Sequence, residues 1–293
     1  MEIFITLFVT GLGLGALYFL VASGLSLIYG LMGVLNFAHG AFLTAGAYAT
    51  WYFTTSIRVD GSLTSYAMSL LIAGLVGALF AVATEQILIK YLYDRHIDQA
   101  LVTVGLGLVA TSAYLGWFGS DPLIVLPPTQ LYNTVQIGDA FVGVDRFLYI
   151  GVAVLVLLAN FLMMRYTRIG LIIRAGVENR SMVTALGIDV RKAFTFVFFI
   201  GGFAAGLGGA LATTYASGVG PTLGDAFLIY AFITVVIGGM GSVPGTAIAA
   251  VIVGTTQVLV NYYVQGLGDF VVVMLLALVL LVRPQGLLGK VAH

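Results

Sequence analysis

Long apolar segments that follow one another along the whole chain constrain its fold more than any other feature. Most of them are about 17 to 25 residues long, and a helix needs about 20 apolar residues to cross a bilayer. Hydrophobic residues make up 60% of the 293-residue chain and charged residues 8%, and the mean hydropathy is +1.09. The sequence therefore predicts an all-α, polytopic transmembrane helical bundle and excludes a water-soluble domain.

The apolar pattern predicts one transmembrane domain over residues 1–293, with eight or nine spans and some interrupted helices. The count depends on whether residues 31–40 join two spans or interrupt one. The first apolar run has no basic segment before it and continues past Gly30, so we interpret it as a retained span and not as a signal peptide. We expect spans near residues 7–29, 37–57, 64–89, 100–119, 147–164, 193–216, 223–238, 243–263 and 268–282.

Positive charge is concentrated between two of these spans. Residues 165–192 carry six of the twelve Lys and Arg residues of the chain. Loops rich in Lys and Arg stay in the cytoplasm, and this orientation also places the basic segments around Lys90 and Arg283 inside. Residues 120–146, which have three Asp and one Arg, then lie outside. Nine spans would put the N-terminus outside as well.

Two glycine-rich segments, residues 29–40 and 238–245, interrupt otherwise continuous apolar sequence. Most of the 38 glycines are expected to let helices pack closely, but paired interruptions in the two halves of a transporter are typical of its substrate site. Asn36 and His39 lie in the first interruption. Either they line a permeation route, with neutral His39 forming a hydrogen bond, or they cap helix ends and satisfy freed backbone groups.

Residue patterns typical of catalysis are missing from the sequence. The chain has no Cys, and its three His residues lack the spacing of a metal site. Residues 286–290 (GLLGK) are similar to part of a phosphate loop, but the G-x-x-x-x-G-K-[ST] spacing is not met and Val291 replaces the hydroxyl residue. We therefore expect no metal site, no catalytic residue and no ATP hydrolysis by this chain itself.

Four motifs occur in order along almost the whole chain. They are residues 35–42 (LNFAHGAF) with 46–48 (GAY), residues 166–170 (YTRIG) with 185–188 (ALGI), residues 236–245 (VIGGMGSVPG) and residues 283–289 (RPQGLLG). Together they resemble the branched-chain amino acid ABC transporter permeases, specifically the LivH type.

The resemblance implies a permease subunit of an ABC importer in the bacterial inner membrane. It would carry branched-chain or related hydrophobic amino acids while ATP is hydrolysed on other subunits. The implied partners are a LivM-like second permease in a heterodimer, two ATP-binding subunits (LivG-like and LivF-like) that hold ATP and Mg, and an extracytoplasmic solute-binding protein.

The polar ends of an amino acid would need partners in the translocation path. The two interruptions supply them through side chains, backbone groups and helix ends. The candidate path residues are Asn36, His39, Gly40, Gly238, Gly239 and Gly241.

Departures from the family pattern concern the substrate. Relatives often carry an acidic residue where this chain has Ala41, and more basic residues where it has residues 171–173. Closely similar permeases serve urea, short amides and small organic acids, and these solutes are the alternative cargo. A stand-alone channel or secondary transporter is a further hypothesis, but it needs carboxylates within the membrane. The spans offer little beyond Glu85 and Asp225.

The basic segment is predicted to contact the ATP-binding subunits. Residues 178–188 combine helix-forming residues with an ALGI ending, which favours a short helix lying across the membrane and closed by Gly187. A solvated loop that only sets orientation is the alternative. The candidate coupling residues are Arg174, Glu178, Asn179, Ala185, Leu186, Gly187 and Ile188.

Overall fold

The computed structural model describes residues 2–33, 36–57, 61–93, 95–185, 187 and 190–289. In this part of the chain almost all regular structure is helical, as predicted. The helices are α1 (Glu2–Met32), α2 (His39–Tyr52), α3 (Leu63–Ile87), α4 (His96–Phe118), α5 (Val144–Tyr166), α6 (Arg168–Ala185), α7 (Val190–Tyr215), α8 (Leu223–Gly238), α9 (Val243–Tyr263) and α10 (Leu267–Val282).

Each predicted span corresponds to one helix, from α1 to α5 and from α7 to α10. Within the described residues, six of them (α1, α3, α4, α5, α7 and α9) are long and apolar enough to cross a membrane. The other three are shorter: α2 has 14 residues, and α8 and α10 have 16 each. A π-helical turn, Phe53–Ile57, extends α2.

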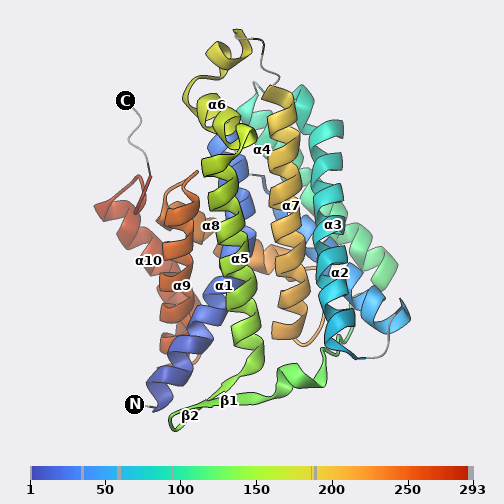
Figure 1. The fold of residues 1–293 in the computed structure, drawn as a ribbon, viewed down its shortest axis with the longest axis vertical. Helices are drawn as coiled ribbons and strands as arrows, with labels where there is room; N and C mark the ends of the chain where they lie inside the picture. The colour runs from blue at the N-terminus through green and yellow to red at the C-terminus, as the bar shows by residue number, and fades with distance from the viewer. Residues whose placement is uncertain are drawn as a thin grey trace.

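Helices α1–α4 and α7–α10 form two interlocked halves with related contacts. α1 packs against α9 and α3 packs against α7, while α1 meets α7 and α2 meets α8 between the halves. In this repeat α1 corresponds to α7, α2 to α8 and α3 to α9. Exchanging these pairs turns the contact of α1 with α9 into the contact of α7 with α3, and leaves the other two contacts unchanged. α1 starts at the end of the molecule where α7 stops (Figure 1). The arrangement is therefore an inverted internal repeat, with α5 and α6 as the connection.

Glycines let the central helices approach backbone to backbone. A Cβ atom on Gly24 would lie 2.7 Å from the Cα atom of Gly201, at the crossing of α1 and α7. A Cβ on Gly11 would lie 2.6 Å from the Cα of Thr255 in α9. Such contacts leave no room for a side chain, as the composition predicted for helices packed in a membrane.

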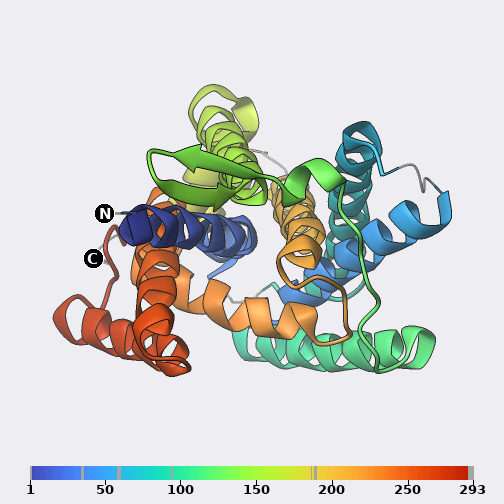
Figure 2. The same ribbon diagram turned by 90° about the horizontal axis from the view of Figure 1, so that it is seen from below.

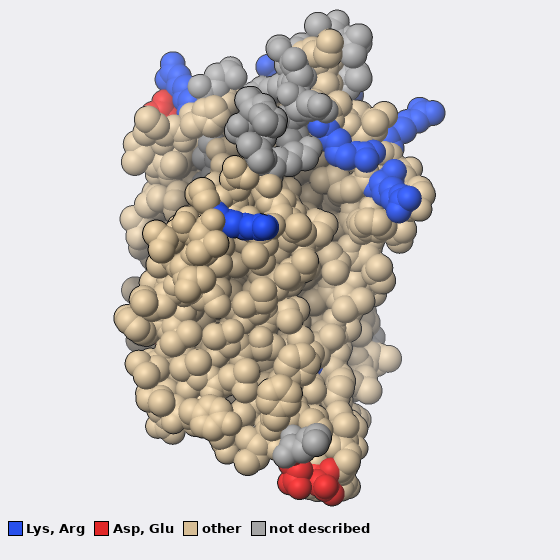
Figure 3. Space-filling view, turned by 90° about the vertical axis from the view of Figure 1, so that its left-hand side faces the viewer, with Lys and Arg blue, Asp and Glu red and all other residues tan. Residues whose placement is uncertain are grey.

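The two ends of the bundle differ in charge. Figure 3 shows most Lys and Arg side chains of the face in view near one end, with one small acidic patch among them, and a larger acidic patch and no Lys or Arg at the other end. α6 lies at the basic end, whereas the start of α1 and the strands lie at the opposite end (Figure 1). Residues 286–289 pack beside Gly239, and Gly241 in the same turn lies against Gly30 near the end of α1. The described chain thus starts and finishes at opposite ends, as an odd number of crossings requires.

A β-hairpin covers the acidic end. β1 (Thr134–Ile137) pairs antiparallel with β2 (Ala140–Gly143), and the loop between them is Gly138-Asp139, with Gly138 at φ +64°. We predicted only that this segment lies outside. A two-residue Gly-Asp loop is a hairpin signal in the sequence, and it would have identified these strands.

Candidate translocation path and coupling region

Asn36 shapes the turn that leads into α2. Its Oδ1 accepts a hydrogen bond from the Ala38 backbone N–H at 3.1 Å, and the Thr103 hydroxyl of α4 accepts one from the Phe37 N–H at 3.2 Å. Asn36 is 3% exposed, and its Nδ2 has no hydrogen-bond partner within the described ranges. Asn36 borders a small cavity of about 10 Å³, with Gln99 and Thr103 on its wall. Asn36 therefore holds the turn before α2 in shape, and its Nδ2 has no partner among the described residues.

His39 anchors the first residue of α2 to the middle of α1. The side chain is fully buried, and its Nε2 lies 3.1 Å from the Val21 carbonyl oxygen. A carbonyl can only accept, so Nε2 carries a proton in this contact. The ring also packs edge-on against Phe42, with centroids 5.6 Å apart. α2 thus begins inside the bundle and not at its surface.

Gly40 brings α2 against the start of α8. A Cβ atom at this position would lie 2.7 Å from the Gly224 carbonyl oxygen. The Thr44 hydroxyl, one turn further on, accepts a hydrogen bond from the Gly224 backbone N–H at 3.0 Å. The first turns of two short helices, one from each half of the repeat, therefore meet inside the bundle.

The second glycine-rich segment forms the tight turn between α8 and α9. Gly239 and Gly241 have φ angles of +98° and +83°, which favour glycine. A Cβ on Gly241 would lie 3.0 Å from the Gly30 Cα, so the two predicted interruptions touch at the basic end. The chain after α10 closes over this turn, because the Leu288 N–H donates to the Gly238 carbonyl at 3.0 Å.

The structural counterpart of the first interruption is the turn between α7 and α8, residues 216–222, which we did not single out from the sequence. Gly218, Gly220 and Pro221 are its signal. Val219 in this turn pairs with Leu123 of the outer segment through two backbone hydrogen bonds of 2.8 and 2.9 Å. The repeat therefore relates the connection between α1 and α2 to residues 216–222, whereas the sequence pattern pairs the first interruption with residues 238–245.

Polar side chains link α1, α9 and α10 on the way to the acidic end. The Tyr18 hydroxyl donates to Gln257 Oε1 at 2.7 Å, and Gln257 Nε2 donates to Asp269 Oδ1 at 2.7 Å. Tyr18 also stacks on Tyr230 of α8, with ring centroids 4.9 Å apart. This network connects α8, α9 and α10 of the second half to α1 of the first half.

Glu85 is a buried carboxylate at the basic end of α3, 1% exposed. Three donors surround it: the Tyr93 hydroxyl, Gln86 Nε2 at 2.7 Å and the Thr195 hydroxyl at 2.9 Å. Thr195 belongs to α7, so the carboxylate joins α3, α7 and the segment after α3. These contacts give Glu85 a role in fixing the helix ends beside the basic segment.

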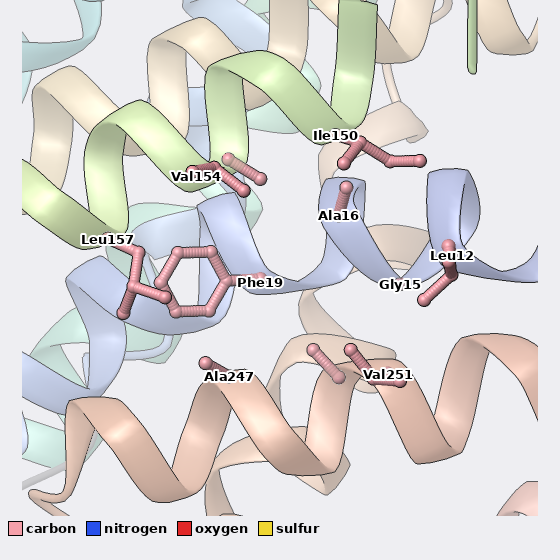
Figure 4. Close-up of a pocket in the computed structure, with 11 residues that line it drawn as sticks. Leu12, Gly15, Ala16, Phe19, Ile150, Val154, Leu157, Ala247 and Val251 are labelled. Carbon is pink, nitrogen blue, oxygen red and sulfur yellow. The ribbon is translucent and has the colours of Figure 1, made fainter. Parts of the chain in front are cut away.

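An apolar groove lies between α1, α5 and α9, with a volume of about 110 Å³. Figure 4 shows Phe19 and Leu157 at one side and Leu12 and Val251 at the other. All lining side chains are aliphatic or aromatic. The groove offers no polar partner for the charged ends of an amino acid, and we do not assign it to the translocation path.

The candidate coupling segment forms α6, which begins ten residues earlier than the predicted helix. The Thr167 hydroxyl explains this start, because it accepts a hydrogen bond from the Gly170 backbone N–H at 3.0 Å, as an N-cap residue does. The predicted closure is confirmed: the helix ends at Ala185, and Gly187 has a φ angle of +77°.

The structure describes only some of the candidate coupling residues. Arg174 is exposed on α6, with its Nε 3.4 Å from the Gly170 carbonyl oxygen. Glu178, Asn179 and Ala185 belong to α6, but their side chains lie outside the described residues. Leu186 and Ile188 lie outside the described residues altogether.

Two inverted halves with interrupted helices and a basic end define a multi-pass membrane transport protein. The family described as the permease component of branched-chain amino acid transport systems matches residues 7–282. The chain belongs to this family. The predicted family and the multi-pass location in the cell membrane are thereby confirmed.

Individual relatives match this chain from end to end. It is 29% identical to the high-affinity branched-chain amino acid transport system permease protein LivH of Salmonella typhimurium, over 96% of this chain and 94% of the relative. The probable LivH of Methanocaldococcus jannaschii is 28% identical over 92% and 88%. The permease protein LivM of Escherichia coli K12 is 27% identical over 93% of this chain and 68% of LivM.

Proposed function

We propose that this chain is a permease subunit of an ABC importer that carries branched-chain or closely related hydrophobic amino acids into the cell. The observation that carries the proposal is the similarity over nearly the full length to LivH proteins, combined with the family match over residues 7–282. The inverted repeat supports it, because such repeats place a substrate site at the interface of two halves that rock against each other.

The proposed assembly has this chain beside a second, LivM-like permease. Support comes from the similarity of the chain to both LivH and LivM, the two permease types of one kind of transport system. Two cytoplasmic LivG-like and LivF-like subunits would hold ATP and Mg and hydrolyse the nucleotide, and an extracytoplasmic binding protein would deliver the solute. This chain itself then catalyses no reaction.

In this proposal the path residues act where the halves touch. Asn36, His39 and Gly40 hold the start of α2 against α1 and α8. Gly238, Gly239 and Gly241 form the closed turn at the basic end. A solute can pass only if such close contacts separate in turn, so these positions would set the shape of the path more than they would grip the solute.

The coupling proposal concerns α6 and the turn after it. A helix at the basic end that exposes Arg168, Leu171 and Arg174 and is followed by a glycine in the left-handed conformation is suited to lie in a groove of an ATP-binding subunit. Arg174, Glu178, Asn179 and residues 185–188 would form that contact. ATP-driven closure of the subunits would then move α5 and α7, which flank α6.

Reconstitution tests the function directly. The chain is purified with its cognate partners, placed in vesicles, and assayed for ATP-dependent uptake of leucine, isoleucine and valine, with urea, acetamide and propionate as competing candidates. Uptake of the branched-chain amino acids supports the proposal, whereas uptake confined to urea, amides or acids selects the alternative cargo. Solute flux through the chain alone, without ATP-binding subunits or ATP, contradicts the ABC assignment.

A further inference from the structure

The carboxylate of Asp225 lies on the surface of the bundle. Its depth in the membrane means that it faces either lipid or a water-filled passage. Asp225 lies in the first turn of α8 and is exposed. Its Oδ2 accepts a hydrogen bond of 3.2 Å from the Thr111 hydroxyl of α4. Figure 2 shows α8 crossing the bundle next to α4.

The depth of Asp225 in the membrane follows from two neighbouring residues, Thr111 of α4 and Gly40 of α2. Thr111 lies 7 residues before the end of α4 at Phe118 and 15 after its start at His96, which is roughly 10 Å and 22 Å along the helix. The second measure runs through α2: Gly224, the residue before Asp225, touches Gly40. The preceding residue, His39, bonds to Val21 of α1. Val21 lies 19 residues after the start of α1 at Glu2 and 11 before its end at Met32. Both measures place Asp225 within the ~30 Å hydrocarbon layer.

Stabilisation of the helix start does not account for this residue. An acidic side chain in the first turn favours a helix through the dipole, and that is the simplest structural explanation. The repeat provides a comparison, because Gly40 and Gly224 occupy related positions and Ala41 therefore corresponds to Asp225. α2 begins with Ala41 buried and no acid in its first turn. The related helix start in the other half of the repeat therefore forms without a carboxylate.

The surface around Asp225 is aliphatic. Leu108 and Leu115 flank Thr111 on the same face of α4 and are 67% and 49% exposed, and Ile229, one turn after Asp225, is 60% exposed. An ionised carboxylate is unstable against lipid, so intramembrane acids face water-filled cavities or other protein. A carboxylate within an aliphatic surface matches a ligand that has a cationic group beside an apolar side chain.

We propose that Asp225 binds the ammonium group of the transported amino acid, and that Leu108, Leu115 and Ile229 contact its aliphatic side chain. The inference rests on the proposed function, since it requires that this face of α4 and α8 borders the passage through the assembled transporter. Thr111 holds the carboxylate in position through its hydroxyl.

The test compares variants of the complete transporter in vesicles, with leucine as the solute. Asp225→Asn keeps the size of the side chain and removes its charge, and we expect leucine uptake to fall by about tenfold or more, the loss typical of a hydrogen bond to a charged group. Asp225→Glu should retain most of the uptake, and Thr111→Val should lose an intermediate amount. Asp121→Asn is the matched control, because Asp121 is exposed in the segment after α4.

Each outcome supports the inference or overturns it. Uptake by Asp225→Asn within twofold of Asp121→Asn overturns the inference. Loss of the second permease from purified Asp225→Asn complexes also overturns it, because Asp225 would then contact a basic group of the partner. Loss of uptake in an intact complex supports it. A wild-type assembly that carries no amino acid refutes the proposed function itself, whatever the variants do.

Discussion

The meeting point of α2 and α8 gives the sharpest structural prediction. A Cβ atom on Gly40 would lie 2.7 Å from the Gly224 carbonyl oxygen, against 3.4 Å or more for an ordinary contact. The neighbour is backbone, so it cannot rotate away, and α2 and α8 must separate by about 0.7 Å at their closest approach. Overpacking of this kind costs about 1–3 kcal/mol. Gly40→Ala should therefore destabilise the protein despite the better helix propensity of Ala.

Gly151→Ala is the matched control. Gly151 lies in α5, and a Cβ atom added there would meet no neighbouring helix or side chain within 4 Å, so Ala should add about 0.5–1 kcal/mol of helix stability. The assay is the midpoint of thermal unfolding of purified protein in detergent, followed by the surviving fraction of the size-exclusion peak. A midpoint for Gly40→Ala equal to or above that of the wild type would refute the close contact between the two helix starts.

Three further perturbations test other parts of the structure. Thr44→Val leaves the buried Gly224 N–H without its acceptor, so the thermal midpoint should fall by the equivalent of about 1–3 kcal/mol. Thr44→Ser keeps the hydroxyl acceptor, and its thermal midpoint should stay near that of the wild type. Glu85→Gln weakens the hydrogen bond that the carboxylate accepts from the Tyr93 hydroxyl, so hydrogen exchange of residues 88–93 should accelerate, with no change expected in the β-hairpin. Gly187→Ala forces a φ of +77° on alanine, at a cost of about 1 kcal/mol. It should lower solute-stimulated ATP hydrolysis in an inserted complex, and unchanged stimulation would leave the segment as an orientation signal.

The sequence predicted helix positions well because apolar length dominates in a membrane. Every expected span has a helix, and Gly187 follows the end of α6 as its place in the ALGI motif indicated. Helix length was less predictable. Residues 37–57 read as one span, yet α2 starts inside the bundle, since His39 bonds to Val21 and not to a surface group. Hydropathy cannot distinguish an apolar residue that faces lipid from one that faces another helix.

The sequence indicated which residues belong to the candidate site, but not which of them contact one another. Asn36, His39 and Gly40 do surround one helix start. The contact between Gly40 and Gly224 links positions 184 residues apart, and no local pattern encodes such a pairing. Asp225 was noted only as a carboxylate within a span. Its exposure depends on how α4 and α8 cross, which becomes visible only when all the helices are placed.

The crossing of α2 and α8 also has a mechanical consequence. The two helix starts touch backbone to backbone at Gly40 and Gly224 and are tied by the Thr44 hydroxyl. Such a contact can rotate but has little room to slide or stretch. We expect it to act as a fulcrum, so that a tilt spreading the halves at the basic end presses them together at the acidic end. One pivot would then keep both ends of the bundle from opening at the same time.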